Sequence, residues 1–494
     1  MLAAVGTTIP ECTKTLEGGV EAALEAARQA PAYVAAQAEA HLGMLAMIVI
    51  AAVFAVVVML VRRGMPIGYV LVIAAALMGI GLGVGFEQTD SHSIGWAAAG
   101  VWNLIVVMAR AAVQPGSLRL LCLVLTITIF GATLKRVEKL RELSASLLAL
   151  LRDRRWVMAS LASFVGLLPM PGGAMVSAPM VGDVADDTEL DGEDKTAINH
   201  WMRHVWEYVD PLYPGLLVAS ATFKVPVAAL MLAQSPLTLA GILGGVVFLL
   251  RRVPHHQRGV GDEAGARSVR PVIKAVLPVA VVVAAAILPQ ALLAIVTKYP
   301  NAASWLPGGA CWADKQFARV ATETAMLLAL FGVIAVLLRA DRVGRAESWR
   351  VIRGGITLKM TALVIGVCVM KGILTASGTV EPIAVFLKST GLPVPVVIGT
   401  VVFIIGMLLG YTLGFVAICF PMLESMLMVN GSLNYPLAAF AFAMGFLGVM
   451  LSPVHLCLVL AREHFDARWG GVYKRLLAPA AVVFFMALIL LLWA

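Results

Sequence analysis

The chain has 494 residues, of which 60% are hydrophobic and only 13% are charged. An ordinary soluble domain has about 25% charged residues, so this composition excludes a water-soluble globule of this size. The net charge of +8 could suggest nucleic acid, but the basic residues gather in short segments between long apolar runs. We therefore expect a membrane protein in contact with lipid, and no nucleic-acid partner.

Residues 1–41 are expected to form an external segment. They contain several glutamates and no uninterrupted apolar core before a cleavage site, so no cleavable signal is predicted. Cys12 and Cys311 both fall on the predicted outer side and could pair, although nothing in the sequence brings them together. The other four cysteines lie in apolar segments and are interpreted as small apolar residues.

The first half, residues 42–250, is predicted to be a series of helical elements, because a helix needs about 20 apolar residues to cross the hydrocarbon. In chain order these are spans 42–61 and 66–85, an external amphipathic segment 95–113, span 118–134, a cytoplasmic amphipathic segment 140–151, an interrupted hydrophobic segment 156–181, a Pro-broken span 201–220 and span 226–250.

After a cytoplasmic linker at 251–271, the second half, residues 272–494, follows much the same order. Its elements are spans 272–297 and 316–338, a cytoplasmic segment 343–353, span 356–376, an external amphipathic segment 379–390, an interrupted segment 393–424, a Pro-broken span 435–458 and span 476–494. Five crossings per half is an odd number, so the halves should have opposite orientations. The sequence thus predicts an all-α polytopic protein with about ten spans and two re-entrant hairpins in an inverted repeat.

Orientation follows from charge. Most of the 37 Lys and Arg residues fall in loops that the positive-inside rule assigns to the cytoplasm. We therefore expect an inner-membrane protein with both termini outside.

The interrupted segments are the strongest indication of function. The first has three prolines and two adjacent glycines at 169–179, so two half-helices should meet at 169–173. Its flanking loops predict a hairpin that opens inward at 156–181. The segment 393–424, broken between 406 and 421, should open outward. Such Gly and Pro residues could instead only permit close helix packing, but matched breaks in both halves point to a transport site.

Half-helix N-termini carry free N–H groups that suit a carboxylate or another anion. Two hairpin tips meeting near the midplane would form one site. The predicted substrate-binding residues are Pro171, Gly172, Gly173, Ser177, Tyr213, Tyr411, Thr412, Gly414 and Ser452.

The Pro-broken span of the first half contains five polar residues on one helical face: His200, Arg203, His204, Glu207 and Asp210. Charges inside a bilayer usually mark a pathway or an ion pair. Arg203 and Glu207, four residues apart, could neutralise each other. Asp210 has no partner in the sequence and is predicted to couple transport to H⁺ or Na⁺, together with Glu207.

In the second half, His455 follows a helix break at Ser452-Pro-Val and could shuttle protons, or could serve only in capping or packing. Lys371 is a further intramembrane charge, and Arg319 and Glu323 suit a neutralised pair.

A metal site is not predicted. His200, His204 and Glu207 could share a face, but the metalloprotease pattern is absent and the sequence indicates no further ligand. We expect no cofactor.

Three motifs resemble an uncharacterised prokaryotic membrane family known only as a domain of unknown function. They are Leu-Leu-Pro-Met-Pro-Gly-Gly-Ala at 167–174, Arg-His-Val-Trp-Glu-Tyr at 203–208 with Pro-Leu-Tyr-Pro-Gly at 211–215, and Ser-Pro-Val-His at 452–455. The resemblance covers roughly residues 42–490 and implies a bacterial or archaeal cell.

The resemblance extends, mainly in architecture, to the wider ion transporter superfamily of gluconate, citrate and dicarboxylate permeases. This implies a scaffold domain and a moving transport domain, an elevator motion, a homodimer, and organic anions carried with Na⁺ or H⁺. The Ser-Asn-Thr hairpin signature of the dicarboxylate branch is absent, and Gly-Gly-Ala occupies the first tip.

The sequence therefore predicts a secondary active transporter of a small anionic solute, coupled to H⁺ or Na⁺. The alternatives are an exporter or a carrier of another solute class, and an intramembrane enzyme. No nucleophile and base motif is found beyond Ser177 and His455, so no enzyme is predicted. The P-loop motif is also absent, so ATP-driven transport within this chain is not expected.

Overall fold

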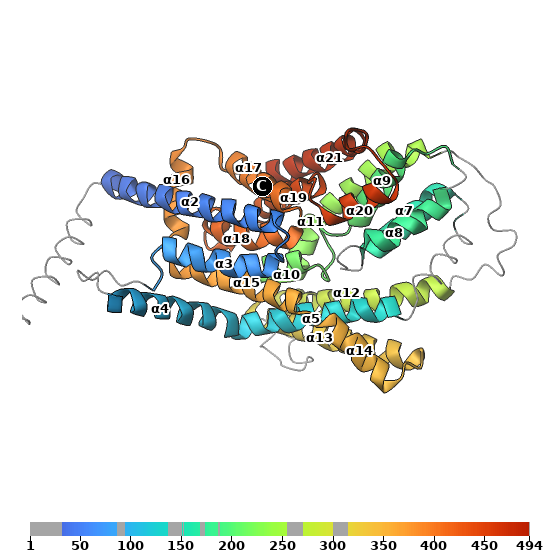
Figure 1. Cartoon of the computed structure of the whole chain (residues 1–494), viewed down its shortest axis with the longest axis horizontal. Coiled ribbons are helices and arrows are strands. Elements are labelled where there is room, and N and C mark those ends of the chain that lie inside the picture. The colour runs from blue at the N-terminus through green and yellow to red at the C-terminus, as the bar shows by residue number, and fades with distance from the viewer. Residues whose placement is uncertain are drawn as a thin grey trace, which may run out of the picture.

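A computed structural model of the chain describes residues 32–85, 94–136, 151, 153–167, 173–185, 188–253, 270–299 and 315–493. The described residues are overwhelmingly helical (Figure 1). They include one two-stranded hairpin, β1 Met428–Val429 paired with β2 Ser432–Leu433. The all-α prediction is confirmed. Cys12, Cys311, residues 1–31, 137–150 and most of the linker lie outside the described residues, so the predictions made for them are not addressed.

The helices follow the predicted order closely. Those of the first half are α2 Ala32–Arg62, α3 Ile67–Gly81, α4 Ile94–Val113, α5 Pro115–Arg136, α7 Arg154–Gly166, α8 Ala174–Ala185, α9 Gly192–His204, α10 Pro214–Phe223 and α11 Val227–Gly244, which continues as the π-helical turn η1 Gly245–Leu249 and the 3₁₀ turn η2 Leu250–Arg252.

Those of the second half are α12 Arg270–Lys298, α13 Lys315–Ala340, α14 Arg345–Gly355, α15 Leu358–Ala376, α16 Val380–Ser389, α17 Val394–Leu409, α18 Thr412–Leu427, α19 Tyr435–Met450, α20 Leu456–His464 and α21 Trp469–Leu492.

Seven of the described helical segments are long and apolar enough to cross a membrane, or eight if α16 and α17 form one span bent by 116°. Several further apolar helices, including α3, α18 and α19, are shorter than 18 residues. The chain is therefore a multi-pass membrane protein, and the count of ten spans stays a prediction.

The helix breaks fall where the sequence placed them. Helices α7 and α8 are separated at 167–173, of which 168–172 lie outside the described residues. Helix α17 ends at Gly410, whose φ of 61° is a left-handed conformation that favours glycine. The turn between α9 and α10 is held by Asp210, because its Oδ1 accepts a hydrogen bond from the Leu212 N–H at 2.9 Å.

Contacts between the halves are reciprocal. Helix α5 of the first half packs on α13 and α14 of the second, and α15, its counterpart, packs on α3 and α4. Likewise α10 packs on α18, while α20 packs on α8. This exchange of partners is what a repeat related by a two-fold axis would produce. The opposite orientation of the halves in a membrane stays a prediction.

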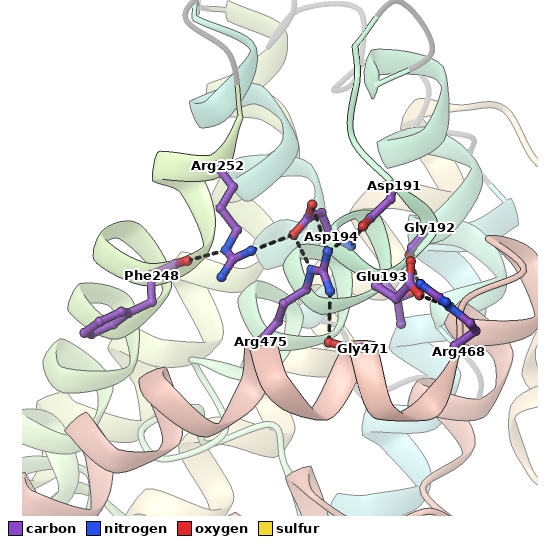
Figure 2. Close-up of polar contacts among 10 residues, drawn as sticks. Asp191, Gly192, Glu193, Asp194, Phe248, Arg252, Arg468, Gly471 and Arg475 are labelled. Atoms are coloured by element: carbon purple, nitrogen blue, oxygen red, sulfur yellow. Dashed lines mark hydrogen bonds and ion pairs between the residues drawn. The ribbon is translucent and has the colours of Figure 1, made fainter.

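An ionic network ties the start of α9 to α21 (Figure 2). Arg468 Nε donates to Glu193 Oε1 at 2.8 Å, and the Arg475 guanidinium pairs with Asp194. Arg252, at the end of η2, lies 3.7 Å from the same Asp194 carboxylate. The Arg468 hydrogen bond holds the pKa of the Glu193 carboxyl below its ordinary value. These pairs fix the polar end of α9, and with it the direction of the helix.

Two intramembrane charges have partners that the sequence did not predict. Glu323 pairs with Arg119 of α5, Nε to Oε2 at 2.7 Å, so the prediction of a pair with Arg319 is wrong. The four-residue spacing allows that pair, but a cation on a neighbouring helix lies closer. Lys371 Nζ donates to the carbonyls of Ala221 and Thr222, at 3.1 and 2.9 Å. It thereby satisfies the C-terminal carbonyls of α10.

Candidate functional site

The first interrupted segment packs against Arg203. A side chain added at Gly173 would collide with the Arg203 guanidinium, and one added at Gly166 would collide with its backbone carbonyl. The Gly166 carbonyl in turn accepts a hydrogen bond from the Tyr213 hydroxyl at 2.6 Å. Glycine is thus required at Gly166, where the backbone lies directly on α9, whereas a methyl group at Gly173 would displace the flexible end of the Arg203 side chain.

The second interrupted segment reaches the same region from the other half. The Gly410 carbonyl accepts a hydrogen bond from His455 Nδ1 at 2.9 Å. Two residues later, the Thr412 hydroxyl donates to Glu207 Oε2 at 2.9 Å. Gly166 and Gly173, on either side of the first break, therefore meet the end of α9 and the α9–α10 turn, and the second break meets the same turn and the break between α19 and α20.

A buried polar cluster fills the space where they meet. His204 Nδ1 lies 2.5 Å from Glu207 Oε1, and its Nε2 lies 3.2 Å from His455 Nε2. Arg203 Nη1 donates to the Cys457 sulfur at 2.8 Å and lies 3.3 Å from His204 Nε2. All five side chains are buried. Such a concentration of polar groups in a membrane protein is costly and indicates a functional site.

A small cavity of about 130 Å³ opens beside this cluster. Its polar lining comes from α9, the α9–α10 turn, and the starts of α18 and α20, and includes Arg203, His204, Glu207, Tyr213, Thr412 and His455. The Tyr213 and Thr412 hydroxyl groups already donate to the Gly166 carbonyl and to Glu207, so the Arg203 guanidinium, which has five N–H donors, is the group that can donate further hydrogen bonds to an anion here.

Five of the predicted site residues line this small cavity: Tyr213, Tyr411, Thr412, Glu207 and His455. Gly173 contributes by its contact with Arg203.

The other predicted residues lie elsewhere. The Ser452 hydroxyl donates to the Met407 carbonyl at 2.5 Å and so holds the helix break. Gly414 faces Leu409 and Ile67. The Ser177 hydroxyl is buried and has no hydrogen-bond partner among the described residues, and the same holds for Asp210 Oδ2. Pro171 and Gly172 are outside the described residues.

The sequence did not assign a binding role to Arg203, His204 or Cys457. Arg203 was interpreted as a partner for Glu207, yet the Glu207 carboxylate takes hydrogen bonds from His204 and Thr412. The sequence does not show that Arg203 lies next to Gly173. The only sequence signal for it was that both lie in the motifs surrounding the first break.

A larger cavity of about 630 Å³ lies between α4, α5, α10, α13 and α15, and we call it the basic cavity. Five cationic side chains and two carboxylates line it: Arg110, Arg119, Lys224, Arg319 and Lys371 against Glu323 and Glu424. Helix α5 lines both cavities, through Leu120 and Leu123 in the basic cavity and through Ile127 and Thr128 in the small one. An excess of positive charge in a concave site concentrates anions.

Comparisons with known proteins agree with the fold. Residues 46–298 and 318–493 match the family described as "Protein of unknown function (DUF401)". Among solved structures, the chain is similar to the crystal structure of the YdaH transporter of Alcanivorax borkumensis, with a TM-score of 0.52 and 14% sequence identity over 86% of this chain and 96% of that one. At this identity the likeness concerns the fold alone. No curated protein sequence matches the chain.

Proposed function

The chain belongs to the DUF401 family, and from this premise we propose that it is a secondary active transporter of a small anionic solute. The observation that carries the proposal is the convergence of both interrupted segments on Arg203, Glu207 and His455. A site built from the breaks of both halves is expected of transporters with repeated halves. The likeness of the fold to a transporter supports it.

The anionic character of the solute is argued from the lining of the two cavities. Arg203 contributes a buried guanidinium next to the small cavity, and guanidinium groups bind carboxylates with two parallel hydrogen bonds. The basic cavity would attract the same class of solute. A small organic acid fits both the charge and the small volume. A carrier of another solute class would not need this excess of cations.

The mechanism is proposed to be an elevator motion in a homodimer, with opposite orientation of the two halves. The reciprocal packing of α5 and α15 supports the repeat. The domains proposed are an external segment 1–41, the first repeat 42–250, the linker 251–271 and the second repeat 272–494. Hairpin 156–181 would open to the cytoplasm and hairpin 393–424 to the outer side of the inner membrane. Both termini would lie on that outer side.

Coupling to H⁺ or Na⁺ is proposed to involve Asp210. This carboxylate is buried, and its Oδ2 has no hydrogen-bond partner among the described residues. A buried acceptor without a donor is costly unless it takes up a proton or a cation. Glu207 and His455 lie in the polar cluster instead, and their predicted coupling role stays untested.

The alternatives have less support. An exporter would use the same site, and only the direction of flux distinguishes it from an importer. An intramembrane hydrolase would need a nucleophile held against a base. The Ser177 hydroxyl has no hydrogen-bond partner among the described residues, so the pair with His455 that such an enzyme would require is not formed.

The test is uptake of labelled di- and tricarboxylates into proteoliposomes, with imposed H⁺ or Na⁺ gradients. We expect gradient-dependent flux for at least one organic acid, and Arg203→Lys should reduce it at least 10-fold because Lys cannot reproduce the planar guanidinium. Arg353→Lys, on the exposed face of α14, is the matched control and should transport normally. Absence of gradient-dependent flux for every anion tested would overturn the proposal.

A further inference from the structure

Three buried histidines from two distant segments meet beside the small cavity, and we call them the histidine cluster: His200 and His204 of α9, and His455 before α20. Their ring centroids are 4.9 to 5.2 Å apart. One ring nitrogen of each lies within 4.8 Å of the other two. We propose that the histidine cluster binds a divalent d-block metal ion such as Zn²⁺ through these three nitrogens.

The second nitrogen of each ring is held by an oxygen. His200 Nε2 lies 3.0 Å from the Met450 carbonyl, His455 Nδ1 lies 2.9 Å from the Gly410 carbonyl, and His204 Nδ1 lies 2.5 Å from the Glu207 carboxylate. A carbonyl or carboxylate oxygen only accepts, so each of these nitrogens carries the hydrogen. This pattern of outer oxygen partners is typical of metal-binding histidines, because it fixes the tautomer and the direction of the ring.

The remaining nitrogens therefore carry lone pairs, and those of His204 and His455 face each other. His204 Nε2 and His455 Nε2 are 3.2 Å apart, and His200 Nδ1 has no hydrogen-bond partner among the described residues. Two facing lone pairs repel unless a cation lies between them. Zn–N bonds of about 2.0–2.1 Å in a tetrahedron place two ligand nitrogens roughly 3.3 Å apart. The His204–His455 pair matches this spacing, and the His200 nitrogen, within 4.8 Å of both, would have to move toward them by up to roughly 1.5 Å.

The Arg203 guanidinium also lies near this position. Its Nη1 lies 3.3 Å from His204 Nε2 but only 2.8 Å from the Cys457 sulfur, so it keeps a partner when a metal takes the imidazole. The Glu207 carboxylate offsets part of the added charge. The fourth coordination position would face the small cavity, since His204 and His455 both line it. An anion there would balance the remaining charge.

The experiment measures metal bound to the whole protein, purified in detergent with a tag that contains no histidine. After exposure to Zn²⁺ and removal of excess, we expect about one zinc per chain, and Co²⁺ in its place should give the visible absorption of a tetrahedral site. His200→Gln, His204→Gln and His455→Gln should each lose the bound metal, whereas His464→Gln, on the same helix as Cys457 but outside the cluster, should keep it.

Glu207→Gln tests the outer partner separately. It leaves all three ligands in place and should weaken metal affinity roughly 10- to 100-fold. Monodisperse, cooperatively unfolding wild-type protein that binds no metal at micromolar free Zn²⁺ would overturn the proposal and leave a shared proton as the occupant. Equal binding by folded His455→Gln protein would also overturn it. No gradient or flux enters this measurement, so its failure is distinct from failure of the proposed transport function.

Discussion

The Thr412 hydroxyl donates a hydrogen bond to Glu207 Oε2 at 2.9 Å, across 205 positions of the sequence. The other carboxylate oxygen of Glu207 accepts from His204 Nδ1 at 2.5 Å. The start of α18, in the second half, thereby fixes a carboxylate that follows α9 in the first. Movement of the second interrupted segment would consequently shift the Glu207 carboxylate within the polar cluster.

We predict that Thr412→Val weakens transport and stability together. Valine keeps the volume but removes the donor, which leaves a buried carboxylate oxygen without its hydrogen bond and costs about 1–3 kcal/mol. The free energy of unfolding should fall by that amount, and the KM for the solute should rise. Both are measured on purified protein, by denaturation in detergent and by uptake into proteoliposomes.

Thr412→Ser retains the donor and should restore both values. Thr324→Val is the matched control, because the hydroxyl of this exposed residue bonds only locally, to the Val320 carbonyl at 2.8 Å. If Thr412→Val and Thr324→Val had the same free energy of unfolding and the same KM, the hydrogen bond between Thr412 and Glu207 would contribute to neither stability nor transport.

Gly173→Ala should impair the site without harming the fold. The added methyl group would occupy the space of the Arg203 guanidinium, which must then move away from Cys457 and the small cavity. We expect uptake to fall at least 10-fold, about 1.4 kcal/mol or more in transition-state terms. Gly332→Ala in α13 has open space for its methyl group, so its uptake should equal that of the wild type. Normal uptake by Gly173→Ala would contradict the role given to Arg203.

The sequence predicted the helices and their breaks well because both depend on local properties. Proline and glycine disrupt a helix wherever it lies, so breaks such as that at Gly410 can be located without any knowledge of packing. Contacts across the chain could not be predicted this way. His204 and His455 are 251 positions apart, and no periodicity relates them, so the sequence could not place His455 beside His200 and His204.

The error at Glu323 has the same origin. An i,i+4 spacing made Arg319 the natural partner, yet the carboxylate pairs with Arg119, 204 positions away. Helical spacing states which pairs can form, and only the packing of α5 on α13 decides which pair does form.

That pair yields a charge-exchange prediction. Arg119→Glu and Glu323→Arg should each destabilise the protein, because like charges would then face each other between α5 and α13. The double variant restores opposite charges, so the coupling energy between the two changes should be about 0.5–3 kcal/mol. The Arg119 and Glu323 side chains are 31% and 23% exposed. Because solvent weakens ion pairs, we expect a coupling energy in the lower part of this range. Arg319→Glu should show no comparable coupling to Glu323→Arg. A coupling energy found for Arg319→Glu and absent for Arg119→Glu would show that Glu323 pairs with Arg319.

The contact between Glu193 and Arg468 predicts a dependence of stability on pH. The Arg468 hydrogen bond lowers the pKa of the Glu193 carboxyl from its ordinary value of 4.5, so folding favours the ionised form. Its contribution is complete above pH 4.5 and is lost as the pH falls through the lowered pKa of the folded state. Glu193→Gln should therefore lower the Tm near pH 7, and the difference from wild type should shrink in acid.

Arg468→Gln provides the internal control. It removes the partner rather than the carboxylate, so combining it with Glu193→Gln should add little to either single change. High salt should reduce the effect of both, because Arg468 is exposed and its field is screened within about 10 Å at 0.1 M. A Tm difference for Glu193→Gln that persisted unchanged from pH 7 to below pH 4 would show that the carboxylate stabilises α9 by packing on Gly471, and not by its charge.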